Sequence, residues 1–245
     1  MGTPPHCDEP KAEEPIAMCG RYVAATPTEV LVEWFGVEEV KASEAEVPPS
    51  WNVAPTREVF AVAESRSAGT RQLGSFRWGL VPSWAKDPSE GARRINARAE
   101  TVATAPTFRK ALRSRRCLVP ADAFYEWEKV EGQKKKQPWL VKRADGDLMA
   151  FAGLWEAWRD VEGKWLRTCA IITTDAAGPL TDIHHRCPVI LERDEWGTWL
   201  DRDTTEPADV LPLLTPPEPE LLELHRVGTE VGNVKNDDPS LLNSL

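Results

Sequence analysis

The first residue of this sequence with distinctive chemistry is a cysteine that directly follows a methionine. Met18 and Cys19 begin the segment MCGRY, after seventeen polar, proline-rich residues. At the start of a chain, Cys19 would carry a free α-amine and a thiol, and such a 1,2-aminothiol closes a thiazolidine ring on an aldehyde. The α-amine has an ordinary pKa of about 7.7 to 8.0, so part of it is nucleophilic near pH 7. An inert buried cysteine is the alternative interpretation.

Two further motifs contain residues suited to proton transfer. In FYEWEK, Glu126 lies between two aromatic residues, an environment that raises the pKa of a carboxyl and suits a general acid or base. A carboxylate that points into water at a strand edge is the alternative. In TDIHHRCPVIL, His184 and His185 are adjacent, and on an extended chain we expect them to face opposite ways, so that one faces a cleft.

Other residues are suited to binding a nucleic acid strand. Asn96 and Arg98, in INARAET, share one face of an extended segment, and the arginine fork suits a phosphate. Trp78, Trp84 and Trp127 stand beside glycine, proline or charged residues, where they could stack on unpaired bases. We expect most of the eleven tryptophans to be core residues instead, including Trp155 and Trp165.

Composition excludes several classes of protein. Hydrophobic residues make up 41% of the 245 residues and charged residues 28%, and no apolar run approaches the roughly 20 residues of a membrane span. Residues 1–17 lack the apolar block of a secretory signal, so we expect a cytoplasmic protein. Five scattered cysteines without a C-x-x-C pair and four histidines without H-x-x-x-H argue against a disulfide framework, a metal site or any metal cofactor.

The charge of the chain is unevenly distributed. The net charge is −9, but residues 91–143 contain fourteen basic and five acidic residues, so this segment is +9 and the remainder is −18. Such asymmetry indicates a cationic face for a polyanion. Solvated basic helix and hairpin surfaces explain the same pattern without any ligand.

The local patterns predict one α+β domain after a leader. We expect helices from a Thr26 cap to Gly36, around 107–114 and within 191–201, and an acidic loop over 41–50. Strands are predicted at 57–65, 71–82, 117–119 (before a turn at Pro120), 137–143, 148–160, 164–176 and at the start of the tail. Asp145-Gly146 favours a tight hairpin turn between two of them. Such an order predicts a curved, mostly antiparallel, barrel-like sheet with few short helices, and residues 1–17 are expected to be disordered or a non-native leader.

Six motifs together resemble the SRAP (SOS-response-associated peptidase) family. They occur in the family's order between Met18 and about Leu241: MCGRY, WNVAPT, RWGLVPSWAKD, INARAET, RCLVPADAFYEW and IHHRCPVIL. The resemblance implies a monomeric DNA-damage protein, nucleoid-associated when bound, whose partners are single-stranded DNA and ss/ds junctions with abasic sites. It implies that the N-terminal cysteine forms a thiazolidine with the opened sugar, in a lyase-like crosslinking reaction that shields the lesion.

The resemblance also assigns roles to individual residues. Cys19 matches the crosslinking cysteine, Asn96 the asparagine that holds the opened sugar, Glu126 the proton shuttle, and His184 the histidine that assists sugar-ring opening. The expected DNA-binding positions are Arg21, Asn52, Pro55, Trp84, Arg98, which contacts phosphate, and Trp127.

The segment before Cys19 departs from the family pattern, in which the chain begins at Met-Cys. While Met18 acylates its nitrogen, Cys19 cannot close a thiazolidine. We therefore expect that translation starts at Met18, or that residues 1–18 are removed by the domain's own processing activity. Two alternatives are a cysteine peptidase that chiefly processes itself, with Cys19 as nucleophile, and a noncovalent single-stranded DNA-binding module if the leader is retained.

Overall fold

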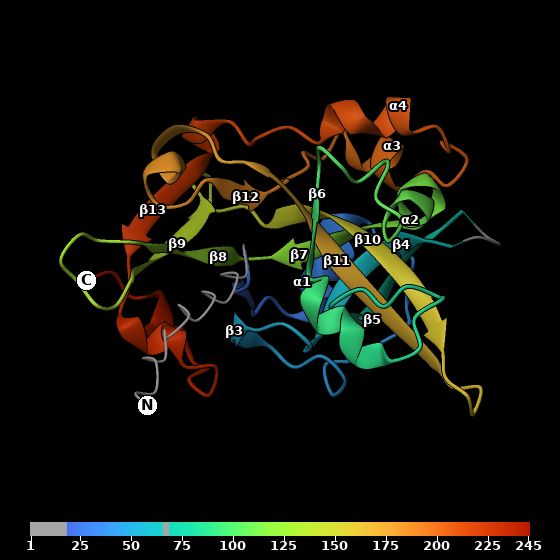
Figure 1. The fold of residues 1–245 in the computed structure, drawn as a ribbon, viewed down its shortest axis with the longest axis horizontal. Coiled ribbons are helices and arrows are strands. Elements are labelled where there is room, and N and C mark those ends of the chain that lie inside the picture. The colour runs from blue at the N-terminus through green and yellow to red at the C-terminus, as the bar shows by residue number, and fades with distance from the viewer. Residues whose placement is uncertain (1–18, 66–68) are drawn as a thin grey trace, which may run out of the picture.

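The computed structural model describes residues 19–65 and 69–245 (Figure 1). The predicted leader lies outside the described residues, as do residues 66–68. The strands form two hydrogen-bonded sheets, one of five strands and one of eight. Helices are few and short, and none of those described is long and apolar enough to cross a membrane.

Five strands of the larger sheet close into a barrel. They are hydrogen-bonded in the order β11-β10-β7-β4-β5, and a parallel pairing of β5 with β11, where Arg77 lies opposite Thr168, completes the ring. The other four pairings of the ring are antiparallel. The predicted α+β fold around a mostly antiparallel, barrel-like sheet is therefore confirmed. The barrel strands are β4 (Glu58–Glu64), β5 (Arg71–Trp78), β7 (Arg116–Ala121), β10 (Met149–Arg159) and β11 (Trp165–Asp175).

Three short strands extend the barrel sheet, and a second sheet lies beside it. Strands β6 (Asn96–Arg98) and β12 (Arg186–Pro188) both pair with β11, and β2 (Glu39–Val40) pairs with β5. The second sheet is antiparallel throughout, in the order β13-β9-β8-β1-β3. Its strands are β1 (Tyr22–Ala24), β3 (Ser50–Val53), β8 (Ala123–Glu128), β9 (Gln137–Arg143) and β13 (Leu222–Arg226).

Two predicted turns differ from the structure. Pro120 lies inside β7 opposite Ala150, because its missing N–H is not needed there: the Ala150 carbonyl accepts from Leu191 instead. Asp145-Gly146 does form a turn, but β9 and β10 do not pair with each other, so the predicted hairpin is wrong. Turn chemistry specifies a local reversal, whereas packing decides which sheet each strand joins.

The predicted helices are present, with one wrong cap. Gly36 ends the first helix in a left-handed conformation with φ 60°, as a C-terminal glycine should. The N-cap of this helix is Pro27, because the Thr26 hydroxyl donates to Asp122 instead. The Thr28 N–H donates to Glu44. The helices are α1 (Thr28–Phe35), α2 (Arg109–Ser114), α3 (Trp196–Leu200) and α4 (Pro207–Val210), with 3-10 turns at Pro88–Arg93, Gly178–Asp182, Leu211–Leu213, Pro219–Leu221, Thr229–Gly232 and Pro239–Leu242.

The two faces of the barrel strands belong to different core clusters. One face packs against the helices, where Phe35 of α1 stacks on Trp196 of α3 at 4.8 Å between ring centroids. The other face contains Trp78 and Phe151, and both rings meet Tyr22 of the second sheet edge to face. Tyr22 thereby fixes the start of β1 against the barrel.

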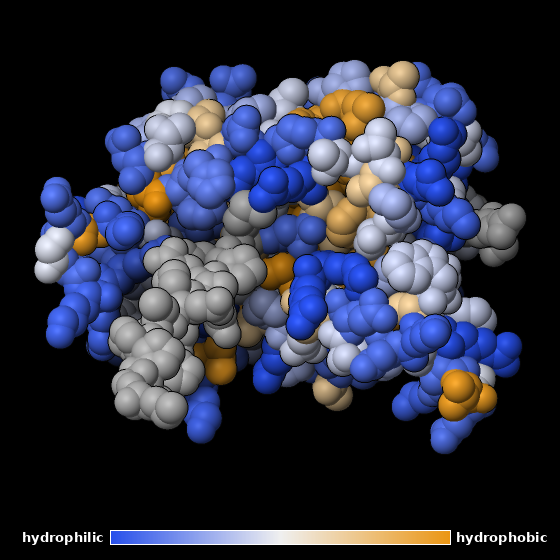
Figure 2. All heavy atoms as spheres, in the orientation of Figure 1, coloured by the Kyte–Doolittle hydropathy of each residue, from blue (hydrophilic) through white to orange (hydrophobic). Residues whose placement is uncertain are grey.

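Not every tryptophan is a core residue. Trp78 and Trp199 are fully buried, but Trp165 is 62% exposed, so the prediction that it belongs to the core is wrong. It is the first residue of β11, three residues before Thr168, where the pairing with β5 closes the barrel. Figure 2 shows the face of the molecule that Figure 1 presents, where hydrophobic residues reach the surface only in small patches between hydrophilic ones.

Candidate functional site

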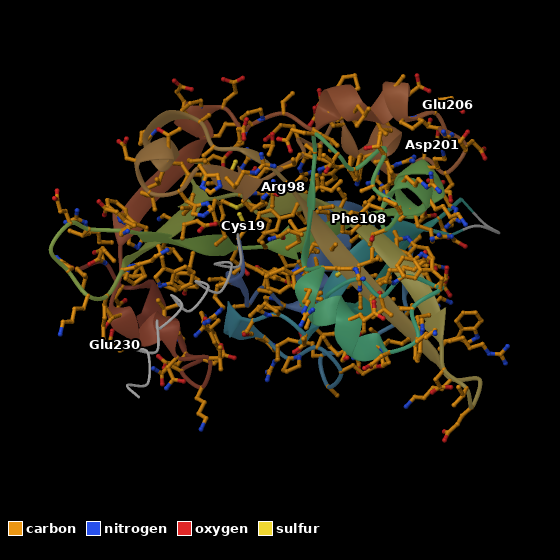
Figure 3. The ribbon with its side chains drawn as sticks, viewed as in Figure 1. Cys19, Arg98, Phe108, Asp201, Glu206 and Glu230 are labelled. Carbon is orange, nitrogen blue, oxygen red and sulfur yellow. The ribbon has the colours of Figure 1, made fainter. Side chains whose placement is uncertain are left out.

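Cys19 lies in the interior, immediately before β1 (Figure 3). It is only 3% exposed. Its backbone nitrogen donates to Glu126 Oε1 at 3.1 Å, and its thiol lies 3.9 Å from the carbonyl oxygen of Arg186. Its φ of 44° is in the left-handed region, which costs a non-glycine residue about 1–3 kcal/mol, so the surrounding contacts must hold it there.

Glu126 reaches Cys19 from β8, the strand that pairs with β1. In this pairing Tyr22 lies opposite Phe124, and Tyr125 donates its N–H to the carbonyl of Arg21, which brings residues 19–21 beside the end of β8. The Glu126 side chain is buried, and burial raises its pKa to about 7 against the opposing effect of the Cys19 hydrogen bonds. A carboxyl with such a pKa can accept or release a proton near neutral pH.

His184 approaches Glu126 from the barrel sheet. Its Nδ1 lies 3.9 Å from Glu126 Oε2, and 3.1 Å from both the backbone nitrogen and the carbonyl oxygen of Arg186. Burial lowers the pKa of His184, which favours the neutral ring. The site thus combines a buried carboxyl on β8 with a neutral imidazole from the segment just before β12.

On an extended chain the two adjacent histidines would face opposite ways, but in the structure they do not. Their ring centroids are 4.6 Å apart and their planes differ by 31°. The reason is that the chain leaves a 3-10 turn here, and the N–H of His184 still donates to the Leu180 carbonyl. Extended geometry begins only at Arg186, the first residue of β12.

Asn96 and Arg98 lie on β6, which pairs with β11 on the side opposite to β12. Ala97 between them is buried in the core, so both side chains point to the other face of the strand, as their spacing predicts. Asn96 is half-buried and Arg98 is exposed. Arg98 lies opposite Thr173, the same β11 residue that lies opposite Pro188 of β12.

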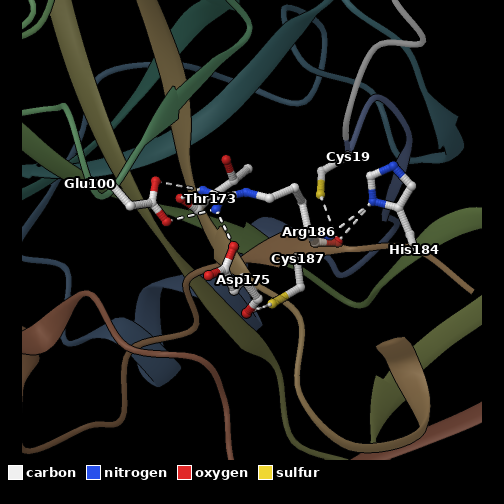
Figure 4. Close-up of polar contacts among 7 residues, drawn as sticks. All are labelled: Cys19, Glu100, Thr173, Asp175, His184, Arg186 and Cys187. Atoms are coloured by element: carbon white, nitrogen blue, oxygen red, sulfur yellow. Dashed lines mark hydrogen bonds and ion pairs between the residues drawn. The ribbon is translucent and has the colours of Figure 1, made fainter. Parts of the chain in front are cut away.

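Arg186 is a central residue of the site that motif reasoning missed. Its carbonyl contacts both Cys19 and His184, while its guanidinium binds Glu100 at 2.6 Å and Asp175 at 2.7 Å (Figure 4). Glu100 directly follows β6, so this ion pair joins the Asn96 segment to the His184 segment across β11. Both residues of this ion pair belong to motifs that the sequence contains: Glu100 is the sixth residue of INARAET, and Arg186 lies in IHHRCP.

The residues expected to bind DNA fall into two groups. Arg21 donates to Asn52 Oδ1 at 2.8 Å, and its guanidinium lies over the Trp127 ring, 5.7 Å from the centroid. Asn52 itself is buried and donates to three carbonyls within residues 231–236. Elsewhere, Pro55 is half-buried after β3, and Trp84 is 59% exposed with the Arg94 guanidinium 5.9 Å from its ring.

Within residues 19–65 and 69–245, histidine, cysteine and acidic residues do not form a metal centre. No group of three or more His, Cys, Asp or Glu side chains there is arranged to hold a metal ion. The four cysteines of these ranges are free and buried, and Cys7 lies outside them.

Comparisons with known proteins agree in one family. A model of the SOS response associated peptidase (SRAP) family matches residues 18–234. The "Abasic site processing protein YoqW" of Bacillus subtilis is 41% identical over 93% of this chain and all of its own length, and the "Abasic site processing protein HMCES" of Pongo abelii is 30% identical over 92% of this chain and 75% of its length.

Solved structures share the fold. A protein from Bacteroides thetaiotaomicron superposes with a TM-score of 0.80 at 24% identity, covering 93% of this chain and all of that one. A protein from Bordetella bronchiseptica gives a TM-score of 0.72 at 29% identity, covering 86% of this chain and all of that one. Together with the match across residues 18–234, these relatives show that the chain belongs to the SOS response associated peptidase (SRAP) family.

Proposed function

We propose that this protein captures abasic sites in single-stranded DNA through a thiazolidine formed by Cys19. Relatives that align with nearly all of the chain are named abasic site processing proteins, which supports the substrate. The observation that carries the proposed chemistry is the 3.1 Å contact between the Cys19 nitrogen and the buried carboxylate of Glu126. This nitrogen is a peptide nitrogen while Met18 is attached, and it becomes an α-amine once the preceding residues are removed.

The proposed reaction forms two bonds and releases one water. The Cys19 amine attacks the aldehyde carbon of the ring-opened sugar, and Glu126 accepts the proton that the nitrogen loses. Glu126 returns this proton to the new alkoxide, which completes the carbinolamine. The carbinolamine then expels its hydroxyl together with the second nitrogen proton as water, and a neutral imine remains. The thiol sulfur adds to the imine carbon, and its proton ends on the ring nitrogen. This closure is intramolecular, which favours it strongly.

Other residues of the site would bind and open the sugar. His184, which lies beside Glu126, would donate a proton to the ring oxygen of the closed sugar as the aldehyde forms. Asn96 would hold the opened sugar, and Arg98, exposed on β6, would contact a phosphate. We assign the further DNA contacts to Arg21 and Trp127, with Trp84 as an exposed stacking surface.

Removal of residues 1–18 is a requirement of this function. A chain that begins at Cys19 would arise by translation from Met18 with loss of that methionine, or by self-cleavage in which Glu126 and His184 assist. If the residues stay attached, only noncovalent DNA binding remains. Intact-mass measurement of the native protein distinguishes these cases.

A general cysteine peptidase is the second candidate, and the geometry favours it less. Such an enzyme needs a thiolate paired with a histidine. Here burial, reinforced by the nearby Glu126, raises the pKa of the Cys19 thiol, and both the thiol and His184 Nδ1 contact the backbone of Arg186 rather than each other. Cleavage of unrelated peptides in trans would favour this candidate.

The test is incubation of the form that begins at Cys19 with single-stranded DNA containing one abasic site. We expect an adduct that survives denaturation, with a mass equal to protein plus DNA minus one water. Cys19→Ala should form none, whereas Cys169→Ala, which removes another buried thiol, should still form it. The form that retains residues 1–18 should also fail. Absence of adduct with folded protein that begins at Cys19 would refute the proposal.

A further inference from the structure

A cavity opens at the end of the barrel opposite to Cys19. Tyr22 and Cys19 lie where β5 ends and β10 begins, because Tyr22 contacts Trp78 and Phe151. The cavity, of about 580 Å³, lies where β4 and β10 end and β5 and β11 begin. In Figure 1 this is the side on which the β10–β11 hairpin extends (yellow, lower right). Its volume is in the range typical of small-molecule sites.

The cavity is lined by an excess of positive charge. Five cationic side chains face two carboxylates, Glu64 and Glu156: Lys41, Lys110, Arg115, Arg167 and Arg202. Arg115 pairs with Glu156 at 2.8 Å. Lys110 and Arg167 are exposed, and neither forms an ion pair with any residue of the two described ranges. Two cations are therefore available to an anionic group, and an arginine fork suits a phosphate.

Aromatic side chains form another part of the wall. Trp165, which is largely exposed, and Trp155 both line the cavity, and Trp155 packs edge to face on Phe76 at 5.9 Å between centroids. An exposed indole beside cations is a surface on which a nucleobase can stack. The cavity thus combines features suited to a phosphate and to an aromatic ring.

We propose that this cavity is a second binding site, which takes one nucleotide unit by its phosphate and its base. Lys110 and Arg167 bind the phosphate, and Trp155 and Trp165 contact the base. The nucleotide is either a free mononucleotide or one unpaired unit of a DNA strand. The site shares no residue with the Cys19 centre, so it stands whether or not Cys19 forms a thiazolidine.

Titration calorimetry of the full chain at low salt tests this site, with dAMP, inorganic phosphate and an eight-residue oligo(dT) as probes. We expect dAMP to bind at least tenfold more tightly than inorganic phosphate. Arg167→Ala and Lys110→Ala each remove a charge-assisted contact, so each should weaken dAMP about tenfold or more. Trp165→Ala removes the exposed indole on which the base would stack, and should weaken it several-fold. The matched control is Arg109→Ala, which removes an exposed cation of α2 outside the cavity and should change the affinity less than twofold.

Competition identifies the source of the nucleotide. If dAMP displaces oligo(dT) and Arg167→Ala weakens both, the site belongs to a DNA strand. If dAMP binds without displacing it, the ligand is a free nucleotide. Binding of dAMP no tighter than phosphate, or unchanged in Arg167→Ala, would overturn the proposal. Cys19→Ala should retain dAMP binding while losing the adduct, so failure of one proposal is distinguishable from failure of the other.

Discussion

Replacing Glu126 by glutamine should stabilise the protein in mild alkali while removing its reactivity. Burial raises the pKa of this carboxyl from its ordinary value of 4.5 to about 7. Between these values the folded protein keeps a proton that the unfolded chain has released, so the free energy of unfolding falls as pH rises through this window. This stabilising contribution is complete below about pH 4.5 and is lost as pH rises through 7.

The magnitude follows from the same two values. Each tenfold change in an ionisation constant is worth about 1.4 kcal/mol, so ionisation of buried Glu126 lowers the free energy of unfolding by about 3 kcal/mol once pH is well above 7. Glutamine has nearly the same size, stays neutral, and retains an oxygen that can accept from the Cys19 nitrogen. The change that Glu126→Gln causes in the free energy of unfolding should therefore be about 2–3 kcal/mol more stabilising at pH 8 than at pH 5.

Urea unfolding at both pH values, followed by tryptophan fluorescence, measures this difference. The matched control is Glu128→Gln on the same strand, where the carboxylate accepts from Trp139 and lies 3.6 Å from Arg226. That substitution removes favourable contacts at either pH and should give no gain at pH 8. If Glu126→Gln destabilises the protein equally at pH 5 and pH 8, the carboxyl is not held in the buried environment described above, and the reasoning fails.

Other perturbations should separate chemistry from stability. The rate of adduct formation should rise at least fivefold from about pH 6 to 7, because Glu126 accepts a proton only when ionised and the amine deprotonates in the same direction; a flat profile in single-turnover assays would exclude this role. Asn52→Ala should lower the free energy of unfolding by about 2–4 kcal/mol, as urea denaturation would show, because the buried Asn52 amide that contacts three carbonyls within residues 231–236 is lost. Gly197→Ala, in α3 where a Cβ meets no atom within 4 Å, should raise the melting temperature, with a gain of about 0.5–1 kcal/mol; a lower value would contradict the open space seen there.

The fold could be predicted from sequence as far as local patterns extend. Alternating and apolar runs located the long strands, and Gly36 located a helix end, because these signals depend only on neighbours in the chain. Barrel closure depends on the parallel pairing of Arg77 with Thr168, two residues far apart in sequence. The partners of β9 and β10 were missed for the same reason, since Asp145-Gly146 specifies a turn and not a pairing.

The site divides in the same way. The residue types of Cys19, Glu126 and His184 suggested their chemistry, and the structure brings all three within hydrogen-bonding or ion-pair range of one another or of Arg186. Arg186 was missed because its role lies in a backbone carbonyl and in an ion pair with Glu100, neither of which a residue type reveals. The three-residue strands β6 and β12 are too short to produce a periodic pattern.

The environment of Cys19 also determines which of its two nucleophiles reacts first in the proposed mechanism. Burial and the adjacent Glu126 raise the pKa of the thiol, so the sulfur stays protonated and is a poor nucleophile at neutral pH. The nitrogen, by contrast, donates directly to the carboxylate that can accept its proton. The carbon–nitrogen bond then forms first, and the sulfur adds afterwards to the imine, in an intramolecular closure. One carboxylate therefore sets the order of the two bonds, because it activates the nitrogen and keeps the sulfur protonated until the imine stands beside it.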